Sequence, residues 1–337
     1  IESARERAAA DNPGLAEMQA RFEALQEVVP QQAALPDPML TFGAMNFPWD
    51  EFDRNQENMT QLQVGVSQVF PYPGKLQLRE EIAAFGAEVA RHSVEEMQLK
   101  LDMNVASTWW DLYFIERSLE TVRRNQELLR QFVDVAKTKY EVGKGLQQDV
   151  LLAPLELSKL LDQEIRIQAL REHRQTALNI LMGHSPSVPI ELAVRPAGPP
   201  PRLVGEEVLY SRALTTRPVL HAKRSNLKAS EARLELARKD HYPDFKVGVT
   251  YGHRDENDLG QSRQDFLSLM VSVNVPIYSG RKQDRAVQQK ARELEKSRYA
   301  LADERNMVMS SISIASTDFN RAVEQVSLFD QGIIPQA

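Results

Sequence analysis

The side chains best suited to binding a metal ion are six histidines and three methionines. No two histidines stand four residues apart, and no carboxylates accompany them in the arrangement that zinc enzymes use. Met39, Met45 and Met59 could offer soft sulfur contacts, although packing is their favoured role. The histidines are His92, His173, His184, His221, His241 and His253. The sequence therefore predicts no protein-only metal site and no cofactor.

Two short motifs that could serve catalysis lack the rest of their machinery. Ser225 and Lys228 have the Ser-x-x-Lys spacing, but they lie in a charged helical stretch with no accompanying motif. Gly143-Lys144-Gly145 lacks the remaining glycines of a phosphate-binding loop. The chain contains no cysteine, which excludes a thiolate nucleophile and a disulfide framework. We therefore do not expect an enzyme.

Composition narrows the possible partners. Charged residues make up 26% of the 337 residues and the formal net charge is −6, whereas a nucleic-acid surface needs a basic stripe. No run of eighteen apolar residues is present, so no membrane-spanning helix is expected. The chain opens at Ile1 without a methionine or a signal peptide, and we expect it to be an excerpt of a mature protein.

The longest expected element is one helix over residues 76–142. Apolar residues recur there in steps of three and four, no proline interrupts it, and its only glycine is Gly86. At the usual rise per residue such a helix would extend roughly 100 Å. A compact core cannot cover a rod of that length. Other helices of this chain, or of further copies of it, must run alongside.

This helix is expected to end in a hairpin tip at residues 143–149. Its two glycines suit a helix C-cap, and Asp149 suits the N-cap of a return helix over 150–182. Pro154 lies past the first turn of that helix and should kink or delay it. The end of a rod is where a partner can bind, so the tip is a candidate contact surface. Its residues are Gly143, Lys144, Gly145, Leu146, Gln147, Gln148 and Asp149.

The chain repeats one order of elements: helix, two strands, long helix. Pro36 matches Pro243 at an offset of 207 (243 − 36), and Gly74 matches Gly280 at an offset of 206 (280 − 74). The first repeat spans 1–185 with strands at 39–45 and 61–70, 186–205 is a proline-rich linker, and the second repeat spans 206–337 with strands at 245–252 and 266–275. Turns at Pro73, Gly74, Ser279 and Gly280 lead into the two long helices, 76–142 and 281–337. The second helix is expected to stop short of its own tip.

The strands alternate polar and apolar residues, which predicts a sheet with two different faces. Four strands leave two unpaired edges, and a membrane barrel needs about eight strands or more, so several copies would have to share one barrel. Leu62, Val64, Val66, Val247, Val249, Leu269, Val271 and Val273 would face lipid. Gln61, Gln63, Ser67, Ser268, Ser272 and Asn274 would face the lumen. A soluble sheet packed on helices is the alternative that the strands alone leave open.

Two acidic loops would join the strands at the outer end of such a barrel, over residues 46–60 and 253–265. We expect them to be solvated loops. Their acidic residues are Asp50, Glu51, Asp53, Glu57, Asp255, Glu256, Asp258 and Asp265.

Several motifs resemble the TolC-like outer-membrane efflux channels, also called outer membrane factors. They are the duplicated unit, Pro36-Asp37-Pro38, Pro73-Gly74-Lys75 with Ser279-Gly280-Arg281, and the run from Lys139 to Ala153. Gln147-Gln148-Asp149-Val150 and Phe42-Gly43-Ala44-Met45-Asn46 are similar to the heavy-metal efflux branch, whereas Pro154 departs from it. The resemblance implies a mainly α fold with a membrane β-barrel portion, in which three chains form a twelve-stranded barrel and an α-helical tunnel.

The same resemblance implies a location and partners. The homotrimer would lie in outer-membrane lipid of a Gram-negative bacterium with its helices in the periplasm, and it would meet a periplasmic adaptor and an inner-membrane proton-driven pump. The expected function is the exit duct of a tripartite efflux system, passively conducting heavy-metal cations, with drugs or other small organic molecules as alternative cargo. A soluble coiled-coil scaffold is the alternative function.

Overall fold

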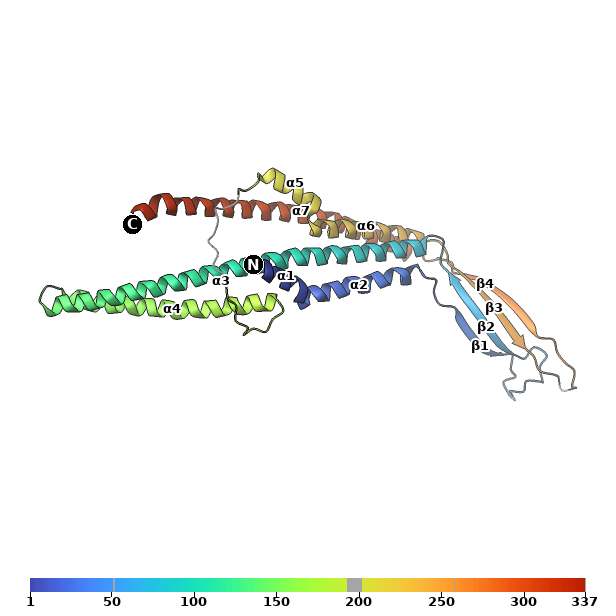
Figure 1. Cartoon of the computed structure of the whole chain (residues 1–337). Helices are drawn as coiled ribbons and strands as arrows, with labels where there is room; N and C mark the ends of the chain where they lie inside the picture. Colours follow the sequence, from blue (N-terminus) through green and yellow to red (C-terminus); the bar gives the residue numbers. More distant parts are fainter. Residues whose placement is uncertain (51, 193–201, 258, 337) are drawn as a thin grey trace. The chain divides into compact units, whose positions relative to one another are not determined.

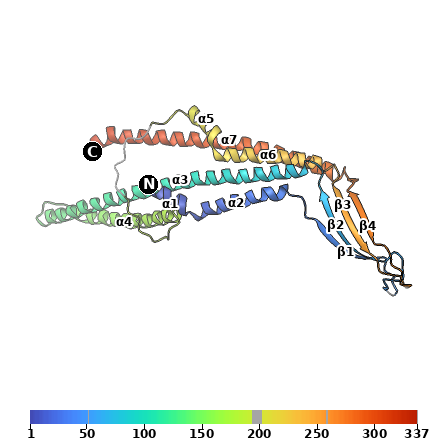
Figure 2. The ribbon, with the colours of Figure 1, turned by 45° about the vertical axis from the view of Figure 1, so that its right-hand side comes forward.

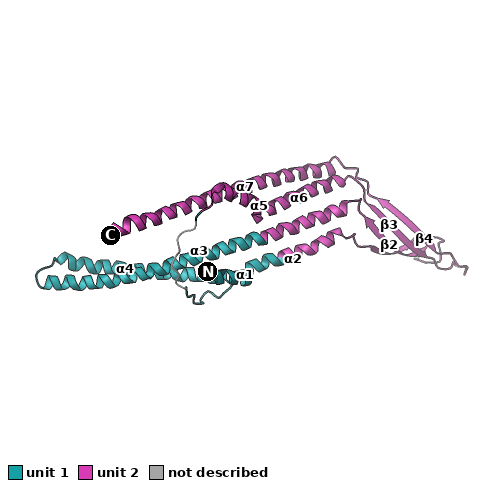
Figure 3. Cartoon of the chain, turned by 45° about the horizontal axis from the view of Figure 1, so that its top comes forward, with its two compact units in different colours: residues 1–20, 94–202 teal, residues 21–93, 203–337 magenta. Residues whose placement is uncertain are grey.

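The computed structural model describes residues 1–50, 52–192, 202–257 and 259–336. Glu51 and Asp258 of the acidic loops and residues 193–201 of the predicted linker lie outside the described residues. The chain divides into two compact units, one of residues 1–20 and 94–202 and the other of residues 21–93 and 203–337 (Figure 3). Each unit is described by itself, and helix α3 (Lys75–Glu141) contributes to both.

The elements follow the expected order along the chain. The helices before the linker are α1 (Glu2–Asp11), α2 (Pro13–Ala33), α3 (Lys75–Glu141) and α4 (Gln147–Leu181). The helices after it are α5 (Glu206–Thr216), α6 (Pro218–Lys239) and α7 (Gln283–Leu328). The strands are β1 (Met39–Met45), β2 (Gln61–Phe70), β3 (Phe245–His253) and β4 (Phe266–Val273). Helix α3 begins and ends within one residue of the predicted 76–142. The prediction is this close because no residue within the helix breaks it.

The first unit buries one apolar cluster and fixes its helix junction with an asparagine. Asn12 is the N-cap of α2, because its side-chain oxygen accepts a hydrogen bond from the backbone N–H of Leu15 at 3.0 Å. Its side-chain amide donates to the carbonyl of Leu181 at 3.0 Å. The cluster comes from α1, α3 and α4 and consists of Ala8, Leu101, Val105, Leu112, Leu178 and Met182.

Polar side chains hold α3 against α4 in the same unit. Gln126 is 2% exposed and donates to the carbonyl of Leu160 and to Glu164, at 3.1 and 2.9 Å. Arg123 reaches the same Glu164 carboxylate at 2.9 Å. These cross-helix bonds let a thin pair of helices hold together with few buried apolar side chains.

The second unit pairs α6 with α7 and carries the sheet. Leu220, Leu301 and Val308 form its apolar cluster. The hydroxyls of Ser230 and Ser297 lie 2.9 Å apart where the two helices meet. Small serines allow the helix backbones to approach closely at this point.

The four strands form an antiparallel meander in the order β1-β2-β3-β4, and they lie side by side in both ribbon views (Figures 1 and 2). Leu40 pairs with Val66, Val66 with Val249, and Val249 with Leu269. Strands β1 and β4 are the two edges, and among the described residues each pairs on one side only. The sheet is therefore open.

Two predicted boundaries in the second repeat are wrong. Strand β4 ends at Val273 rather than at residue 275, because Pro276 cannot donate a ladder hydrogen bond and Asn274 instead bonds to Asp244. Helix α7 begins at Gln283 rather than at residue 281, because the N–H groups of residues 281 and 282 both donate to the carbonyl of Tyr278 in a turn. The α-helix ends at Leu328, and a π-helical turn and a 3₁₀ turn follow it up to Gln336.

The return helix also differs from its prediction. Helix α4 begins at Gln147 and contains Pro154 without being delayed by it. The residue before this helix is Leu146, so Asp149 lies in the first turn and is not the N-cap. A carboxylate in a first turn interacts favourably with the positive end of the helix dipole. In the described part of the chain, no helix is both long and apolar enough to cross a membrane.

Candidate functional site

The register of the sheet places the eight residues predicted to face lipid on one side. Directly paired residues of an antiparallel ladder share a face, and successive residues alternate faces. Val66 pairs with Val249 and Val249 with Leu269, and the same parity links the other five. We call this side the apolar face. It consists of Leu40, Phe42, Ala44, Leu62, Val64, Val66, Phe70, Phe245, Val247, Val249, Tyr251, Leu267, Leu269, Val271 and Val273, with Gln68 and His253 as polar members.

The apolar face is uncovered in the chain. Phe42 is 74% exposed, Leu269 is 73% exposed and Val66 is 51% exposed. A soluble monomer rarely exposes so large a contiguous apolar patch, so this surface indicates an interaction with lipid or with protein.

The opposite side, which we call the polar face, carries five of the six residues predicted to line a lumen: Gln61, Gln63, Ser67, Ser268 and Ser272. Glycines make room for the polar side chains here. A Cβ atom at Gly252 would lie 1.9 Å from Oε1 of Gln61, and one at Gly65 would lie 2.7 Å from the Thr250 hydroxyl. The polar face is therefore crowded at these two positions, where glycine leaves room for the facing side chains.

Asn274, the sixth predicted lumen residue, lies outside the sheet. Its side-chain oxygen accepts a hydrogen bond from the backbone N–H of Asp244, and its own N–H donates to the Asp244 carbonyl. This side chain closes the end of the β3–β4 ladder, and the prediction that it belongs to a strand is wrong.

The turn after β2 is fixed by a buried lysine. Lys75, the first residue of α3, is 3% exposed, and its amine lies 2.9 Å from Asp244, 3.3 Å from Asp240 and 3.1 Å from the carbonyl of Tyr242. The backbone N–H of Tyr72 donates to the same Asp244 oxygen at 2.8 Å. The rings of Tyr72 and Tyr242 stack with centroids 4.5 Å apart.

The burial of the Asp244 carboxyl opposes ionisation and by itself raises its pKa. The hydrogen bond from Tyr72 and the Lys75 ammonium outweigh burial, so the pKa of Asp244 lies below its ordinary 3.8. Asp244 is therefore an ionised anchor that joins the start of α3 to the start of β3.

The predicted turn residues differ between the two repeats. Gly74 adopts a φ of +84°, a conformation that favours glycine, beside the bond from Lys239 to the Pro73 carbonyl at 3.2 Å. Ser279 and Gly280 lie in the turn after β4, but Gly280 does not adopt a positive φ. The second turn therefore does not repeat the backbone conformation of the first.

The hairpin tip in the first unit is a short turn between two helices. Gly143 has a φ of +72° and donates to the Tyr140 carbonyl at 2.9 Å, while Lys144 donates to the Lys139 carbonyl at 2.8 Å. These bonds cap α3. Gly145, Leu146 and the first turn of α4, Gln147, Gln148 and Asp149, complete the predicted tip.

Large apolar side chains are exposed around this turn. Val142 is 62% exposed, Leu146 is 67% exposed and Leu151 is 66% exposed. The tip thus presents an apolar surface at the end of a helical hairpin, which suits a protein partner.

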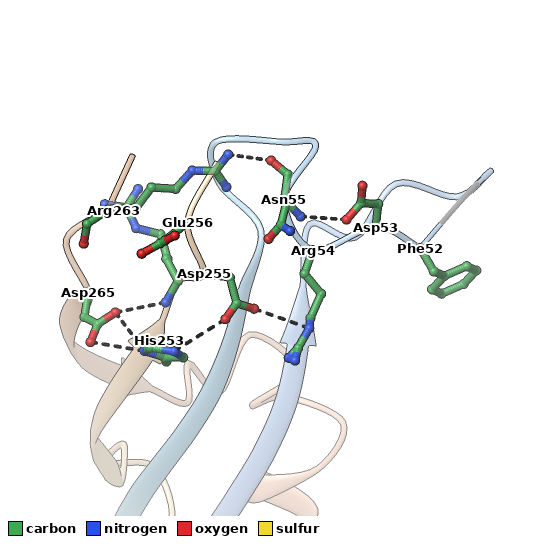
Figure 4. A pocket seen from close by; sticks show the side chains of 11 residues that line it. Phe52, Asp53, Arg54, Asn55, His253, Asp255, Glu256, Arg263 and Asp265 are labelled. Atoms are coloured by element: carbon green, nitrogen blue, oxygen red, sulfur yellow. Dashed lines mark hydrogen bonds and ion pairs between the residues drawn. The ribbon is translucent and has the colours of Figure 1, made fainter. Parts of the chain in front are cut away.

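At the end of the sheet away from Lys75, the loops 46–60 and 253–265 line an open pocket of about 830 Å³ (Figure 4). His253 lies between two carboxylates, 3.1 Å from Asp265 and 3.7 Å from Asp255, and Arg54 lies 3.3 Å from Asp255. The hydroxyl of Tyr251 and then the backbone N–H of Arg254 donate to Asp265, which lowers the pKa of that carboxyl to about 2.

Arginines tie the two loops together, a feature that the acidic composition did not predict. Arg263 donates to the carbonyls of Asn55 and Glu57 at 2.6 and 2.8 Å, and Arg254 donates to the carbonyl of Asn58 at 3.2 Å. The loops are solvent-exposed as expected, and the arginine bonds between them are an addition that the expectation did not contain. Arg254 and Arg263 stand among the acidic residues of the loop 253–265, and they were the signal in the sequence that the loops could be joined.

No group of three or more histidine, cysteine, aspartate or glutamate side chains within the described ranges could hold a metal ion.

Comparisons with known proteins agree with this architecture. Protein CyaE of Bordetella pertussis is 23% identical over 262 residues, 75% of this chain and 52% of that protein. Outer membrane protein TolC of Vibrio cholerae is 23% identical over 189 residues, 54% of this chain and 43% of that protein. This chain spans about half the length of these curated relatives.

The fold matches solved outer-membrane channels. The structure of the outer-membrane channel OprN superposes with a TM-score of 0.82 at 18% identity, over 98% of this chain and 76% of that one. A sequence model of the Outer membrane efflux protein family matches residues 4–184 and 209–334. The chain, with its open two-faced sheet and its long helices, therefore belongs to the outer membrane efflux protein family.

Proposed function

We propose that this chain forms the exit duct of a tripartite efflux system in the outer membrane of a Gram-negative bacterium. The observation that carries the proposal is the open sheet with one exposed apolar face and an opposite face that carries glutamines, serines and glycines. Three chains would supply twelve strands, with strand pairs from the repeats 1–185 and 206–337. The duct conducts passively and performs no covalent chemistry.

The order of the strands supports closure by further copies. In a four-stranded meander the edge strands β1 and β4 run antiparallel, so β1 of one copy can add to β4 of the next without changing the pattern. In lipid, unpaired edge groups cost several kcal/mol each, so an open sheet cannot remain there. Two copies would give the smallest known barrels, and the homotrimer follows from the family resemblance.

The apolar face supports contact with lipid. Aromatic residues lie near both ends of its strands: Phe42 and Tyr251 toward the outer loops, and Phe70 and Phe245 at the opposite end. Between them the face consists mostly of valine and leucine, with Gln68 as a polar member. Phe245 and Tyr251 lie six positions apart on β3, which corresponds to about 20 Å of strand. This layout suits the apolar band and aromatic girdles of outer-membrane barrels.

The polar face then lines a lumen filled with water. Glycines and serines leave room for the larger side chains of this face, while Gln61 and Gln63 supply hydrogen-bonding groups near the outer end of the sheet. The helices would continue the lumen into the periplasm, and we propose that the channel opens by movement of helices near the tip.

The tip is the proposed surface for a periplasmic adaptor protein, and an inner-membrane proton-driven pump would supply the cargo. Exposed Val142, Leu146 and Leu151 offer the apolar centre of such an interface, with Lys144 and Asp149 at its rim. No nucleic-acid partner is proposed.

Heavy-metal cations are the proposed cargo, because the tip run Gln147–Val150 and the β1 run Phe42–Asn46 resemble the heavy-metal branch. A strain that lacks the gene should become sensitive to one or more of copper, zinc and cobalt. Sensitivity confined to organic toxins would replace metals by small organic molecules as the cargo class.

Extraction from cells tests the duct itself against the soluble-scaffold alternative. The full-length protein should require detergent and should migrate as a trimer that dissociates only on heating. A monomer or dimer that stays in solution without detergent would overturn the duct. The exposed apolar face already disfavours a soluble scaffold, since water would contact Phe42 and Leu269.

A further inference from the structure

The duplication in the sequence relates two strand-to-helix junctions, of which only one is complete in the described part of the chain. Lys75 begins α3 after β2, and it binds Asp244, which precedes β3. At the repeat offsets of 206 and 207, Lys75 corresponds to Arg281 and Asp244 corresponds to Asp37. Each repeat thus carries one cation and one carboxylate, and the pair seen in the structure joins the cation of the first repeat to the carboxylate of the second.

The second cation and the first carboxylate have no such pairing here. Arg281 and Asp37 are both exposed, and in the described part of the chain neither side chain has a hydrogen bond or an ion pair. Lys75, by contrast, is 3% exposed. Opposite charges at equivalent positions are thus buried at one junction and free at the other.

The neighbouring aromatic contact repeats the same asymmetry. Tyr72 stacks on Tyr242. Their counterparts are Tyr278, at an offset of 206, and Leu35, at an offset of 207. Tyr278 is 72% exposed and Leu35 is 46% exposed. Tyr278 and Leu35 are therefore exposed, like Arg281 and Asp37, whereas their counterparts Tyr72 and Tyr242 stack on each other.

The topology puts the free groups at the two edges of the sheet and at the same end. Asp37 and Leu35 precede edge strand β1, while Tyr278 and Arg281 follow edge strand β4. In an antiparallel meander the start of β1 and the finish of β4 lie at one end of the sheet. A copy that adds its β1 to this β4 brings its own Asp37 and Leu35 to Arg281 and Tyr278.

We propose that Arg281 of one copy binds Asp37 of the next copy, with Tyr278 packed on Leu35, repeating between chains the Lys75–Asp244 junction seen within one chain. The occupant of this surface is a second copy of the same chain. The inference rests on the proposed barrel and adds to it a specific polar latch between neighbouring copies. Guanidinium and carboxylate groups can form two parallel hydrogen bonds, so this latch also fixes register.

A cross-linking experiment on the full-length protein in membranes tests the latch. Residues 1–337 contain no cysteine, so the double variant Leu35→Cys with Tyr278→Cys introduces two thiols at chosen positions in this part of the protein. A short bismaleimide should convert it to covalent dimers and trimers that survive boiling in detergent. The matched control is Tyr72→Cys with Tyr242→Cys, which joins the equivalent positions inside one chain and should yield monomers only.

The outcomes separate the latch from the duct. If the Leu35/Tyr278 variant stays monomeric after cross-linking while its unboiled trimer persists, the latch is wrong and the duct stands. If the unmodified protein forms no trimer, both are wrong. Covalent trimers from Leu35/Tyr278 together with monomers from Tyr72/Tyr242 support the latch.

Charge reversal gives an independent measurement. Arg281→Asp and Asp37→Arg should each lower the trimer-to-monomer ratio by about tenfold or more, because like charges would meet at every interface. The double variant restores opposite charges and should recover most of the trimer. Single variants that assemble as well as the unmodified chain would overturn the latch.

Discussion

The amine of Lys75 lies 2.9 Å from the carboxylate of Asp244, although 169 residues separate them in the chain. Removing this amine should destabilise the second unit, because Asp244 would remain partly buried without its cation. Lys75→Met should cost about 3 kcal/mol of unfolding free energy. Thermal unfolding in detergent measures it.

Lys159→Met is the matched control for that substitution. Lys159 is 62% exposed and pairs with Glu156 three residues away. Its replacement should change the unfolding free energy by less than about 0.5 kcal/mol. Equal effects of the two substitutions would contradict the role assigned to Lys75.

The depressed pKa of Asp244 predicts a specific acid sensitivity. A carboxyl with a lowered folded-state pKa stabilises the fold fully above its unfolded pKa, and this contribution disappears as the pH falls from the ordinary 3.8 through the folded-state value. Asp244→Asn should therefore be less stable than the unmodified protein at pH 7. The difference between their unfolding temperatures should shrink below pH 4, and a constant difference down to pH 2 would be inconsistent with this assignment.

The hairpin tip should tolerate no proline at Gly143. Its φ of +72° is closed to proline, and proline would also lose the 2.9 Å hydrogen bond to Tyr140. Gly143→Pro should abolish export, leaving cells as sensitive as a deletion strain, while the detergent-resistant trimer still forms. Survival assays and unboiled gels provide the two readouts.

Gly86→Ala is the control for the tip. A Cβ atom there meets nothing within 4 Å, and alanine should favour helix α3 by about 0.5–1 kcal/mol. Export should remain normal. Normal export by Gly143→Pro would remove the functional role from the tip.

The two faces of β2 should respond oppositely to arginine. Val66 lies at the middle of the apolar face, paired with Leu40 and Val249, and arginine there should cost about 2–4 kcal/mol in the membrane. Gln63→Arg places the same side chain on the polar face. The yield of folded trimer should fall for Val66→Arg and hold for Gln63→Arg, and equal yields would argue against opposite surroundings for the two faces.

Local patterns were sufficient to predict most of the helices and strands. The stretch that became α3 lacks proline and has one glycine, and the period-two alternation in β2 placed Val64 and Val66 on one face. The repeat offset also related the two pairs of strands. Each of these signals lies within one segment or in a comparison of two segments.

Features that depend on distant partners could not be predicted. Asn274 leaves the sheet because it bonds to Asp244, and no pattern within β4 reveals that bond. The loop arginines, such as Arg263, reach carbonyls more than 200 residues away. Pro154 lies within α4 and is exposed, whereas a proline past the first turn predicts a kink or a delayed start of the helix.

Cysteine accessibility along β2 tests the central claim most directly. Single cysteines placed in turn at residues 61–69 of the full-length protein, in native outer membranes, would be treated with a water-soluble, membrane-impermeant maleimide. The account predicts alternation: rapid labelling at Gln63 and Ser67, and protection at Leu62, Val64 and Val66. Labelling at similar rates on both faces, or protection of the odd positions instead, would contradict a barrel with its apolar face in lipid and its polar face in water.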